Sequence, residues 1–443
     1  MDYNQALDYL NHLARFGSKL GLERMHDLLE LLGRPDADLN VIHVAGTNGK
    51  GSVCAGLNSI LRAAGRSVGL YTSPHLSRFN ERIAIDGEPI SNQDLARVLT
   101  EVRRAADVVA GQEESPTQFE VSTAAMLLYF REKRPDFVIL EVGLGGRLDA
   151  TNSVSRPLLT VITPVSLDHT EVLGPDLPSV AREKAGILKP GVPVVIGPQE
   201  PPALEVIERA AGELGCPALH VAEGAQGPDW AGFAPVDVGP HGGEFRYWDS
   251  LEGEDSLWRA DGVKTSLLGR HQIPNAAVAV ASARQLGRLG HVKITREHLR
   301  SGLKSCIWPG RLEVIGRSPR VIVDGAHNAA GASALAEALT EIWPKADLVL
   351  LFAAQGHKNW RDMLGPLAAL SREVVVTRVP WGQSLDPEEA ISWLGRGMAC
   401  SDLEKAADMA LETAGPNSTV LITGSLYLVG PARDLVLAGG DQP

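Results

Sequence analysis

The chain has 443 residues, of which 44% are hydrophobic and 22% are charged, and its formal net charge is −12. This length exceeds that of one ordinary domain, which holds roughly 100 to 200 residues, so we expect two domains. The acidic balance argues against a protein that binds nucleic acid, because such proteins need clustered Lys and Arg to replace phosphate counterions.

The N-terminus and the cysteines bear on cellular location. The first ten residues include Asp2 and Asp8 and lack a basic start followed by an apolar run, so they predict neither a signal peptide nor a transit peptide. No run reaches the roughly 20 apolar residues that cross a bilayer, so we expect no membrane partner. The four cysteines are far apart, without the spacing of a zinc site or the density of a disulfide scaffold. We therefore expect a cytoplasmic protein with unliganded cysteines.

From residue 41 almost to the C-terminus, apolar β-branched runs alternate with amphipathic stretches. This alternation is typical of βαβ units and a parallel sheet, so the predicted fold class is α/β. The runs expected to form buried strands are 41–44, 137–142, 159–162, 192–196, 321–323, 348–352 and 419–422. In open α/β sheets ligands collect at the carboxyl ends of the strands, and functional residues are expected there.

A glycine-rich loop follows the first of these strands and precedes a helix expected at 53–64. It reads Ala45-Gly46-Thr47-Asn48-Gly49-Lys50-Gly51-Ser52. Strand, loop and helix together form a phosphate cradle, in which Lys50 reaches the β- and γ-phosphates of a nucleotide. The strict pattern is not met, because Val44 replaces the first glycine and Gly51 stands where a magnesium-binding hydroxyl usually follows. The alternative is a structural turn with an exposed lysine.

Two further strand ends carry candidate metal ligands. Glu141 ends the strand expected at 137–142 and precedes a glycine-rich turn. Its carboxylate suits a hard cation such as Mg²⁺, although a strand-end acid can equally cap the turn. His169 follows the strand expected at 159–162. A lone histidine is more often packed or capping than liganding, so from the residues alone both alternatives stay open.

The later part of the chain suggests where the domains divide. Residues 224–262 are rich in Gly, Pro, Trp and Asp, and we expect a peripheral loop or a small antiparallel excursion rather than core. A helix expected at 295–305 precedes a new series of strands and helices. We therefore predict a P-loop-type parallel-sheet ATPase domain over 1–305 and a smaller Rossmann-like α/β domain over 306–443.

Several further sequence blocks point to one protein family. They are Tyr71-Thr72-Ser73-Pro74-His75-Leu76, Phe79-Asn80-Glu81-Arg82-Ile83, Glu141 to Asn152, Leu167-Asp168-His169, Glu183-Lys184-Ala185-Gly186-Ile187, Gly269-Arg270-His271-Gln272, Trp308-Pro309-Gly310-Arg311, Asp324-Gly325-Ala326-His327-Asn328 and Gly424-Ser425-Leu426-Tyr427. In these blocks and their order the chain resembles folylpolyglutamate synthases and dihydrofolate synthases of the Mur-ligase superfamily. It departs at Gln355-Gly356-His357-Lys358-Asn359-Trp360, where the family usually shows an Asp-Lys-Asp type of sequence.

The resemblance implies an ATP site shared by both domains and a magnesium cluster, which the family pattern suggests holds two ions. Nucleotide contacts beyond the loop would come from Asn275, Arg311, Asp324 and His327. Asp324 would accept the ribose hydroxyls, and Arg311 would bring a guanidinium onto the phosphates. The implied magnesium ligands are Ser73, Glu141 and His169, with Ser73 compensating for Gly51.

Lys184 is the least usual of the implied site residues. A free ammonium beside magnesium would be repelled, and in the family the matching lysine is carboxylated by CO₂. The carbamate would be anionic and could support the second magnesium. The alternative is a solvated helix lysine that pairs with Glu183.

The acid substrate is implied to lie in the first domain. The family pattern points to Gly21-Leu22-Glu23-Arg24, Thr117-Gln118-Phe119-Glu120 and Leu148-Asp149-Ala150. Phe119 offers a flat face for a pterin, although core packing is an equal alternative.

The implied reaction joins L-glutamate to dihydropteroate and to reduced folates through an acyl phosphate. Lys50, Lys184 and His169 would be the catalytic residues, and Arg311 would help to neutralise the transferred phosphoryl group. The expected partners are these small molecules alone, with the chain a monomer. The alternatives are a monofunctional folylpolyglutamate synthase, a superfamily ligase acting on a cell-wall precursor, and an ATP-hydrolysing switch or binding module.

Overall fold

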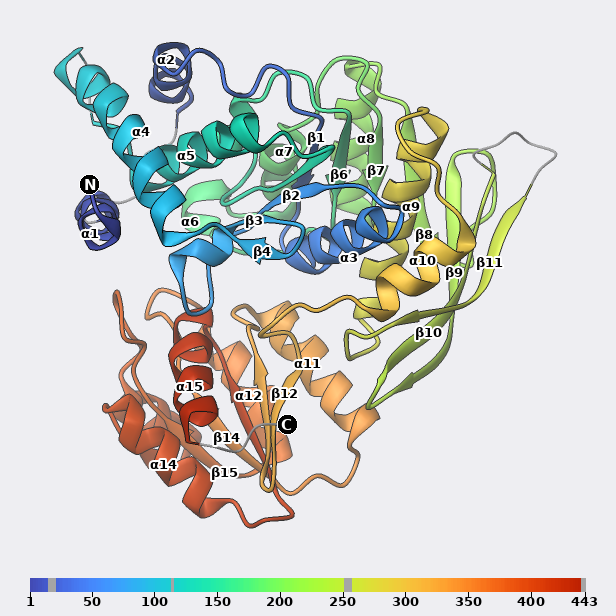
Figure 1. The fold of residues 1–443 in the computed structure, drawn as a ribbon. Helices are drawn as coiled ribbons and strands as arrows, with labels where there is room; N and C mark the ends of the chain where they lie inside the picture. The colour runs from blue at the N-terminus through green and yellow to red at the C-terminus, as the bar shows by residue number, and fades with distance from the viewer. Residues whose placement is uncertain (15–20, 113–114, 251–256, 440–443) are drawn as a thin grey trace.

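The structure, a computed structural model, describes residues 1–14, 21–112, 115–250 and 257–439. Its strands form one sheet of eleven strands and a second sheet of six (Figure 1). Strands that end by Thr265 belong to the first sheet, and strands that begin at Glu313 or later belong to the second. Helices cover both sheets, so the predicted α/β class is confirmed. We call the two parts the large and the small domain.

The centre of the large sheet is parallel. Its strands, in spatial order, are β2 (Val68–Tyr71), β5 (Phe137–Glu141), β1 (Val41–Ala45), β6 (Leu159–Ile162), β7 (Val194–Ile196) and β8 (Ala218–Glu223). Nearly every residue of β1, β2, β5, β6 and β7 is buried, because helices cover both faces of a parallel sheet. Since β1 lies between β5 and β6, the chain crosses over on each side of β1, which creates the kind of crevice where α/β proteins bind ligands.

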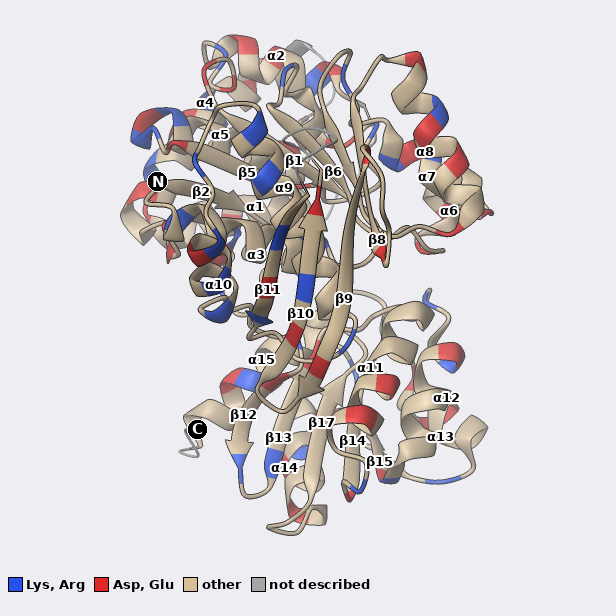
Figure 2. Cartoon of the chain, turned by 90° about the vertical axis from the view of Figure 1, so that its right-hand side faces the viewer, with Lys and Arg blue, Asp and Glu red and all other residues tan. Residues whose placement is uncertain are grey.

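Both edges of the large sheet are antiparallel. The short strands β3 (Ile83–Ile85) and β4 (Glu88–Pro89) extend one edge. On the other edge, β9 (Trp230–Gly239) pairs in parallel with β8, and β10 (Gly242–Asp249) and β11 (Trp258–Thr265) continue the sheet in antiparallel pairs (Figure 2).

These edge strands correct one expectation. The antiparallel alternative for 224–262 is confirmed, but its placement outside the core was wrong, because Phe245, Tyr247 and Val263 belong to the main hydrophobic cluster. Their alternation with exposed residues buries one face of β10 and β11. Residues 251–256 of this stretch lie outside the described residues. Val238, near the end of β9, also packs against the core of the small domain.

Helices cover the large sheet on both faces. The first face carries α3 (Lys50–Ala63), α9 (Gln272–Arg288) and α10 (Arg296–Lys304). The opposite face carries α1 (Tyr3–Ala14), α2 (Glu23–Leu31), α4 (Asn92–Gln112) and α5 (Gln118–Lys133). Helices α7 (Leu177–Ala185) and α8 (Pro201–Glu213) pack on β6 and β7, and a short α6 (Thr170–Leu173) precedes them.

The small domain confirms the Rossmann-like expectation. Its strands, in spatial order, are β12 (Glu313–Arg317), β13 (Arg320–Asp324), β17 (Thr419–Thr423), β14 (Leu348–Phe352), β15 (Ser371–Val376) and β16 (Met398–Ala399). All pairs are parallel except β12 with β13. Helices α11 (Ala329–Ile342), α12 (Trp360–Leu370) and α13 (Pro387–Leu394) cover one face, and α14 (Leu403–Thr413) and α15 (Leu426–Ala438) cover the other.

The loop after β2 joins the two domains. Leu76 packs against the core of the small domain beside α15. The Ser77 hydroxyl donates a hydrogen bond of 2.8 Å to Asp434. Gly430 of α15 has no Cβ, and a Cβ there would lie 1.8 Å from the carbonyl oxygen of Leu76. Ser73 lies near the start of this loop, so we expect these contacts to influence the position of Ser73.

The helices and the cysteines bear on two further expectations. None of the described helices is long and apolar enough to cross a membrane. All four cysteines are free thiols, and three of them are buried.

Candidate active site

The glycine-rich loop between β1 and α3 is closely packed. Gly46 has φ +149°, and a Cβ there would lie 1.8 Å from Thr163 Oγ1. Gly49 has φ +83°, and a Cβ there would lie 2.3 Å from Asn275 Oδ1. Both positions therefore require glycine. The close approach also places the Asn275 amide, from α9, against the loop.

Residues after β6 hold the loop in place. The Thr47 backbone N–H donates to the Pro164 carbonyl at 3.0 Å, and the Thr47 hydroxyl donates to the Ser166 carbonyl at 2.9 Å. The Thr163 hydroxyl donates to the Asn48 carbonyl at 2.8 Å. These bonds fix the loop before any ligand binds, which reduces the entropy lost on binding.

Two lysines converge on this loop. Lys50 Nζ donates to the Gly46 and Thr47 carbonyls, each at 3.1 Å, and Lys184 Nζ, from α7, donates to the Gly46 carbonyl at 2.8 Å. The Lys184 residue is only 5% exposed. Burial, aided by the charge of Lys50, lowers the pKa of Lys184 to about 7. The alternative of a solvated lysine paired with Glu183 is therefore wrong, since Glu183 instead pairs with Arg147 at 2.9 Å.

Trp308 explains the unusual Gly51. A Cβ at Gly51 would lie 2.7 Å from the indole Nε1 of Trp308, which lies in the segment between the domains. A serine or threonine hydroxyl at this position would meet the indole ring. The structure thus leaves no room for the hydroxyl that usually follows the lysine of such loops.

The residues expected to bind magnesium lie around the same loop. Glu141 is the last residue of β5. This strand pairs with β1, and Glu141 lies opposite Val44. The Ser73 backbone N–H donates to Glu141 Oε2 at 3.3 Å. Burial raises the pKa of Glu141 although Lys50 opposes the shift, and burial lowers the pKa of His169. A buried carboxylate and a neutral imidazole offer donors that fit a divalent cation.

All predicted nucleotide, metal and catalytic residues line one cavity of about 370 Å³. They are Thr47, Asn48, Gly49, Lys50, Gly51, Ser52, Ser73, Glu141, His169, Lys184, Asn275, Arg311, Asp324 and His327. The first eleven come from the large domain and the last three from the small domain, so this nucleotide-side cavity lies between the domains.

The site residues of the small domain differ in how many of their polar atoms already form hydrogen bonds within the protein. The Asp324 carboxylate accepts the backbone N–H groups of Leu312 at 2.9 Å and Ala326 at 2.8 Å. These bonds hold the loops after Arg311 and after β13, and a contact of Asp324 with ribose stays a prediction. Arg311 donates to the Gly310 carbonyl at 3.2 Å and makes no ion pair within the described ranges. Its charge is available to a ligand.

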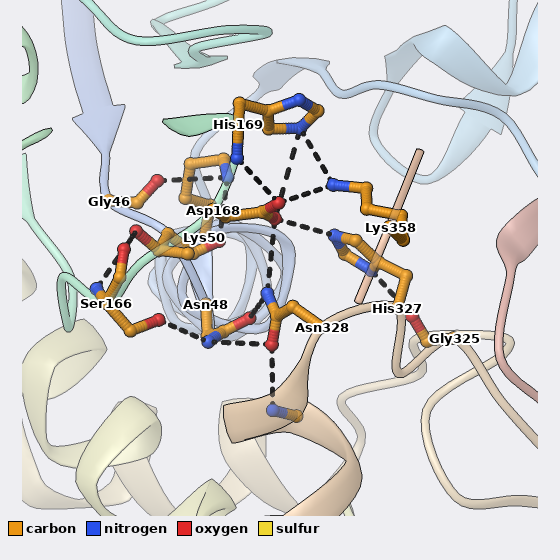
Figure 3. A network of polar contacts seen from close by, with 12 residues as sticks. Gly46, Asn48, Lys50, Ser166, Asp168, His169, Gly325, His327, Asn328 and Lys358 are labelled. Atoms are coloured by element: carbon orange, nitrogen blue, oxygen red, sulfur yellow. Dashed lines mark hydrogen bonds and ion pairs between the residues drawn. The ribbon is translucent and has the colours of Figure 1, made fainter. Parts of the chain in front are cut away.

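A polar network around Asp168 links the domains (Figure 3). Asn328, the N-cap of α11, donates to Asp168 at 3.2 Å and to Asn48 Oδ1 at 3.0 Å. Lys358 makes an ion pair with Asp168. Burial alone would raise the pKa of Asp168, but the Lys358 ammonium holds it below its usual value. Asp168 and Asn328 stood inside the quoted sequence blocks, yet no role was predicted for them.

A second cavity of about 490 Å³ adjoins the first. Both cavities are lined by Ser73, His169 and His327. Eight of the eleven residues predicted to bind the acid substrate line this acid-side cavity. They are Gly21, Thr117, Gln118, Phe119, Glu120, Leu148, Asp149 and Ala150.

The other three predicted substrate residues, Leu22, Glu23 and Arg24, do not line it. Arg24 instead donates to Glu120 at 3.0 Å, in an ion pair that supports the start of α5. A direct contact of Arg24 with substrate stays a prediction.

Asp149 and Phe119 also have structural partners. The Asp149 carboxylate accepts the backbone N–H groups of Gly143 at 3.1 Å and Leu144 at 2.9 Å, and so shapes the turn after β5. The Phe119 ring lies 6.1 Å from the ring of Tyr71 and is only partly buried. Phe119 therefore both packs against the core and presents a surface to the cavity.

Arg82 is a cavity residue for which no role was predicted. It is 9% exposed, lines the acid-side cavity, and donates from Nε to His75 Nδ1 at 2.8 Å. Burial lowers its pKa, and within the described ranges it makes no ion pair. A buried guanidinium without a carboxylate partner is costly unless a ligand supplies the anion. Arg82 stood inside one of the quoted sequence blocks. Its lack of a carboxylate partner could not be predicted, because the pairing of an arginine depends on the fold.

The large domain matches the family described as "Mur ligase middle domain" over residues 44–283. The small domain matches "Mur ligase, glutamate ligase domain" over residues 310–426. Together with the phosphate loop and the cavity between the domains, these matches show that the chain belongs to the Mur ligase family.

Relatives place it more narrowly among the dihydrofolate synthase/folylpolyglutamate synthases. A Bacillus subtilis protein of that name is 36% identical over 97% of this chain and 98% of its own length, and the Escherichia coli protein of that name is 34% identical over 97% and 94%. Folylpolyglutamate synthase of Mycobacterium tuberculosis, solved with ADP and AMPPCP, superposes with a TM-score of 0.88 at 30% identity, each chain covered in full. E. coli FolC in complex with DHPP and ADP superposes with a TM-score of 0.87 at 32% identity, over 99% and 98%.

Proposed function

We propose that this protein is an ATP-dependent ligase that joins L-glutamate first to dihydropteroate and then to the γ-carboxylate of reduced folates. The observation that carries the proposal is the meeting of the two cavities at Ser73, His169 and His327. One cavity has the phosphate loop and the other has apolar and polar walls suited to a flat acid. A carboxylate in the second cavity would therefore lie beside a nucleotide phosphate in the first. The names of the relatives support both activities.

ATP would bind across the domain boundary that we predict at 305/306. Backbone N–H groups at the start of α3 and the charge of Lys50 suit the phosphates. Arg311 approaches from the small domain, and its guanidinium forms no ion pair with a carboxylate of the described residues. The ADP and AMPPCP complexes of the M. tuberculosis relative support nucleotide binding here.

The reaction would proceed in two steps. A carboxylate oxygen of the acid attacks the γ-phosphorus, the bond from that phosphorus to the β,γ-bridging oxygen breaks, and ADP leaves. The glutamate nitrogen then attacks the acyl carbon, loses a proton, and phosphate departs. Lys50 and Arg311 would stabilise the charge on the transferred phosphoryl group by position and electrostatics.

Ser73, Glu141 and His169 would hold magnesium, which when bound would add positive charge beside the phosphates. Lys184 would contribute through a carbamate. Only the neutral amine reacts with CO₂, and a pKa of about 7 leaves much of the amine neutral at neutral pH. The carbamate would replace an ammonium that now faces Lys50 with an anion, which favours a second magnesium ion.

The wall of the acid-side cavity suggests where glutamate binds. Arg82 from the large domain and Ser425 and Tyr427 from the small domain line it together. The matched glutamate ligase domain supplies Ser425. We assign the glutamate carboxylates to Arg82, because that guanidinium has no carboxylate partner among the described residues. Free cysteines suit a reducing compartment, so we also propose a cytoplasmic enzyme, acting as a monomer.

The test is a product assay with purified protein, ATP, Mg²⁺ and L-glutamate, using dihydropteroate in one arm and tetrahydrofolate in the other. We expect dihydrofolate from the first arm and glutamate-extended folate from the second, each with one phosphate released per bond. Extension of tetrahydrofolate without dihydrofolate at saturating dihydropteroate would leave a monofunctional folylpolyglutamate synthase. Phosphate release that ignores L-glutamate in both arms would contradict ligation and favour an ATP-hydrolysing switch.

A further inference from the structure

A loop of the small domain faces the large domain at three side chains of the types that metal ions accept as ligands. His357 and Lys358 lie between β14 and α12, in the segment that departs from the family pattern. Lys358 reaches across to Asp168, and His357 lies close to His169 and Glu171 at the start of α6. One ligand atom from each of His169, Glu171 and His357 lies within 4.8 Å of the others.

We propose that His169, Glu171 and His357 form a site for a divalent transition metal such as Zn²⁺, which bridges the two domains. Two imidazoles and one carboxylate are a donor set that zinc accepts, with the fourth position open to water. A tetrahedral site with metal–ligand distances near 2.1 Å needs ligand atoms roughly 3.4 Å apart. Glu171 and His357 are both exposed, so their side chains are free to rotate over the remaining distance.

The surrounding charges permit a cation. Neutral imidazole is the form of histidine that binds a metal, and two of the three side chains are histidines. The Lys358 ammonium lies 3.4 Å from His169 Nε2, but Asp168 pairs with this ammonium and offsets its charge. Glu171 adds a negative charge of its own.

The site has a consequence for the reaction that rests on the proposed function of His169 as a magnesium ligand. A neutral imidazole has one nitrogen lone pair to offer, so His169 can bind only one cation at a time. A transition metal held by Glu171 and His357 would therefore take His169 from magnesium. It would also tie the small domain to the large domain through His357. Zinc should inhibit ligation in competition with magnesium.

The binding test uses the full chain freed of metal, without nucleotide or folate, and titrates Zn²⁺ by calorimetry. Cobalt(II) in place of zinc reports the ligand geometry through its visible absorption. We expect His357→Ala and Glu171→Gln each to weaken zinc binding by about tenfold or more, since even loss of a residue that orients a metal ligand costs about 10- to 100-fold. His291→Ala, which removes an exposed imidazole elsewhere, should bind zinc as the wild type does.

Inhibition separates this site from the proposed role of His169. In the ligation assay, the zinc concentration for half inhibition should rise with magnesium in the wild type and be about tenfold higher in His357→Ala. Equal zinc affinity in wild type, His357→Ala and Glu171→Gln would overturn the site, whatever the magnesium dependence. Zinc binding that needs His357 but does not compete with magnesium would support the site and instead contradict His169 as a magnesium ligand.

Discussion

Lys50 and Lys184 donate hydrogen bonds to the same acceptor, the carbonyl oxygen of Gly46, at 3.1 and 2.8 Å. Two ammonium groups on one carbonyl repel each other, and Lys184 is also buried. These two effects, burial above all, bring the pKa of Lys184 down to about 7. Carboxylation would resolve the repulsion, because the carbamate is anionic and Lys50 then becomes its partner.

We expect Lys184→Ala to lower the turnover number by roughly 100-fold, the usual scale for losing one group that stabilises the transition state. The fold should persist, because the described residues give Lys184 one hydrogen bond and its removal relieves buried charge. Added short-chain carboxylates should restore part of the activity by replacing the carbamate. Lys189→Ala is the matched control, since Lys189 is also partly buried and donates to a backbone carbonyl, of Asn152, at 3.2 Å. Full activity in Lys184→Ala would remove the carbamate from the mechanism.

The same pKa predicts how stability depends on pH in CO₂-free buffer. Lys184 titrates near pH 7 when folded and near its ordinary pKa of 10.5 when unfolded. Between these values the unfolded state binds the extra proton, so the stability of the wild type rises with pH. Below pH 7 the full cost of the buried ammonium remains. Lys184→Met should therefore raise the Tm most below pH 7, and the gain should shrink toward about pH 10. A Tm difference that does not change with pH, followed by thermal melts, would rule out this titration.

Glu141→Gln and His169→Ala should each raise the magnesium concentration for half-maximal activity by roughly tenfold or more. Thermal stability should change little for Glu141→Gln, because the amide keeps the shape and removes a carboxylate whose pKa is raised by burial. Magnesium titrations of the initial rate, beside thermal melts, check both changes. If either variant merely unfolds, the side chain serves packing or turn capping and not metal binding.

The sequence predicted those parts of the site that local signals carry. Apolar runs ending in polar residues located β1, β5 and β6, and the structure brings the ends of these strands together around the phosphate loop. Contacts between segments that are far apart in the chain could not be predicted from the sequence. Asp168 and Lys358 are 190 positions apart, and nothing in either neighbourhood indicates their pairing.

The edge strands and Arg24 show two other limits. The Gly-, Pro- and Trp-rich composition of 224–262 favoured a loop, yet alternation along β10 buries Phe245 and Tyr247. Arg24 stands in a block attributed to substrate binding, but its guanidinium is engaged by Glu120. Composition and motif position do not reveal which partner a side chain meets once distant segments pack.

Gly430→Ala should disturb the loop that carries Ser73, although Gly430 itself lines neither cavity. The added Cβ would lie 1.8 Å from the Leu76 carbonyl, so the loop and α15 must separate. We expect a lower turnover number and a higher magnesium requirement. Gly365→Ala is the control, because that helical glycine has only Trp393, at 3.7 Å, near its Cβ position among the described residues. An unchanged magnesium requirement in Gly430→Ala would show that docking of the loop does not set the position of Ser73.

Arg82→Gln should raise the KM for L-glutamate more than the KM for ATP or for the pterin acid. Arg82 is buried and makes no ion pair in the described chain, so its charge is available to a ligand. A hydrogen bond to a charged group contributes about 1.5 to 3 kcal/mol, which corresponds to roughly 10- to 150-fold in affinity. Arg78→Gln, four residues earlier and exposed, controls for general loss of positive charge. Initial rates with each substrate varied in turn separate the three constants. An equal rise in all three would mean that Arg82 supports the shape of the cavity, and a rise confined to the pterin acid would assign its charge to that carboxylate.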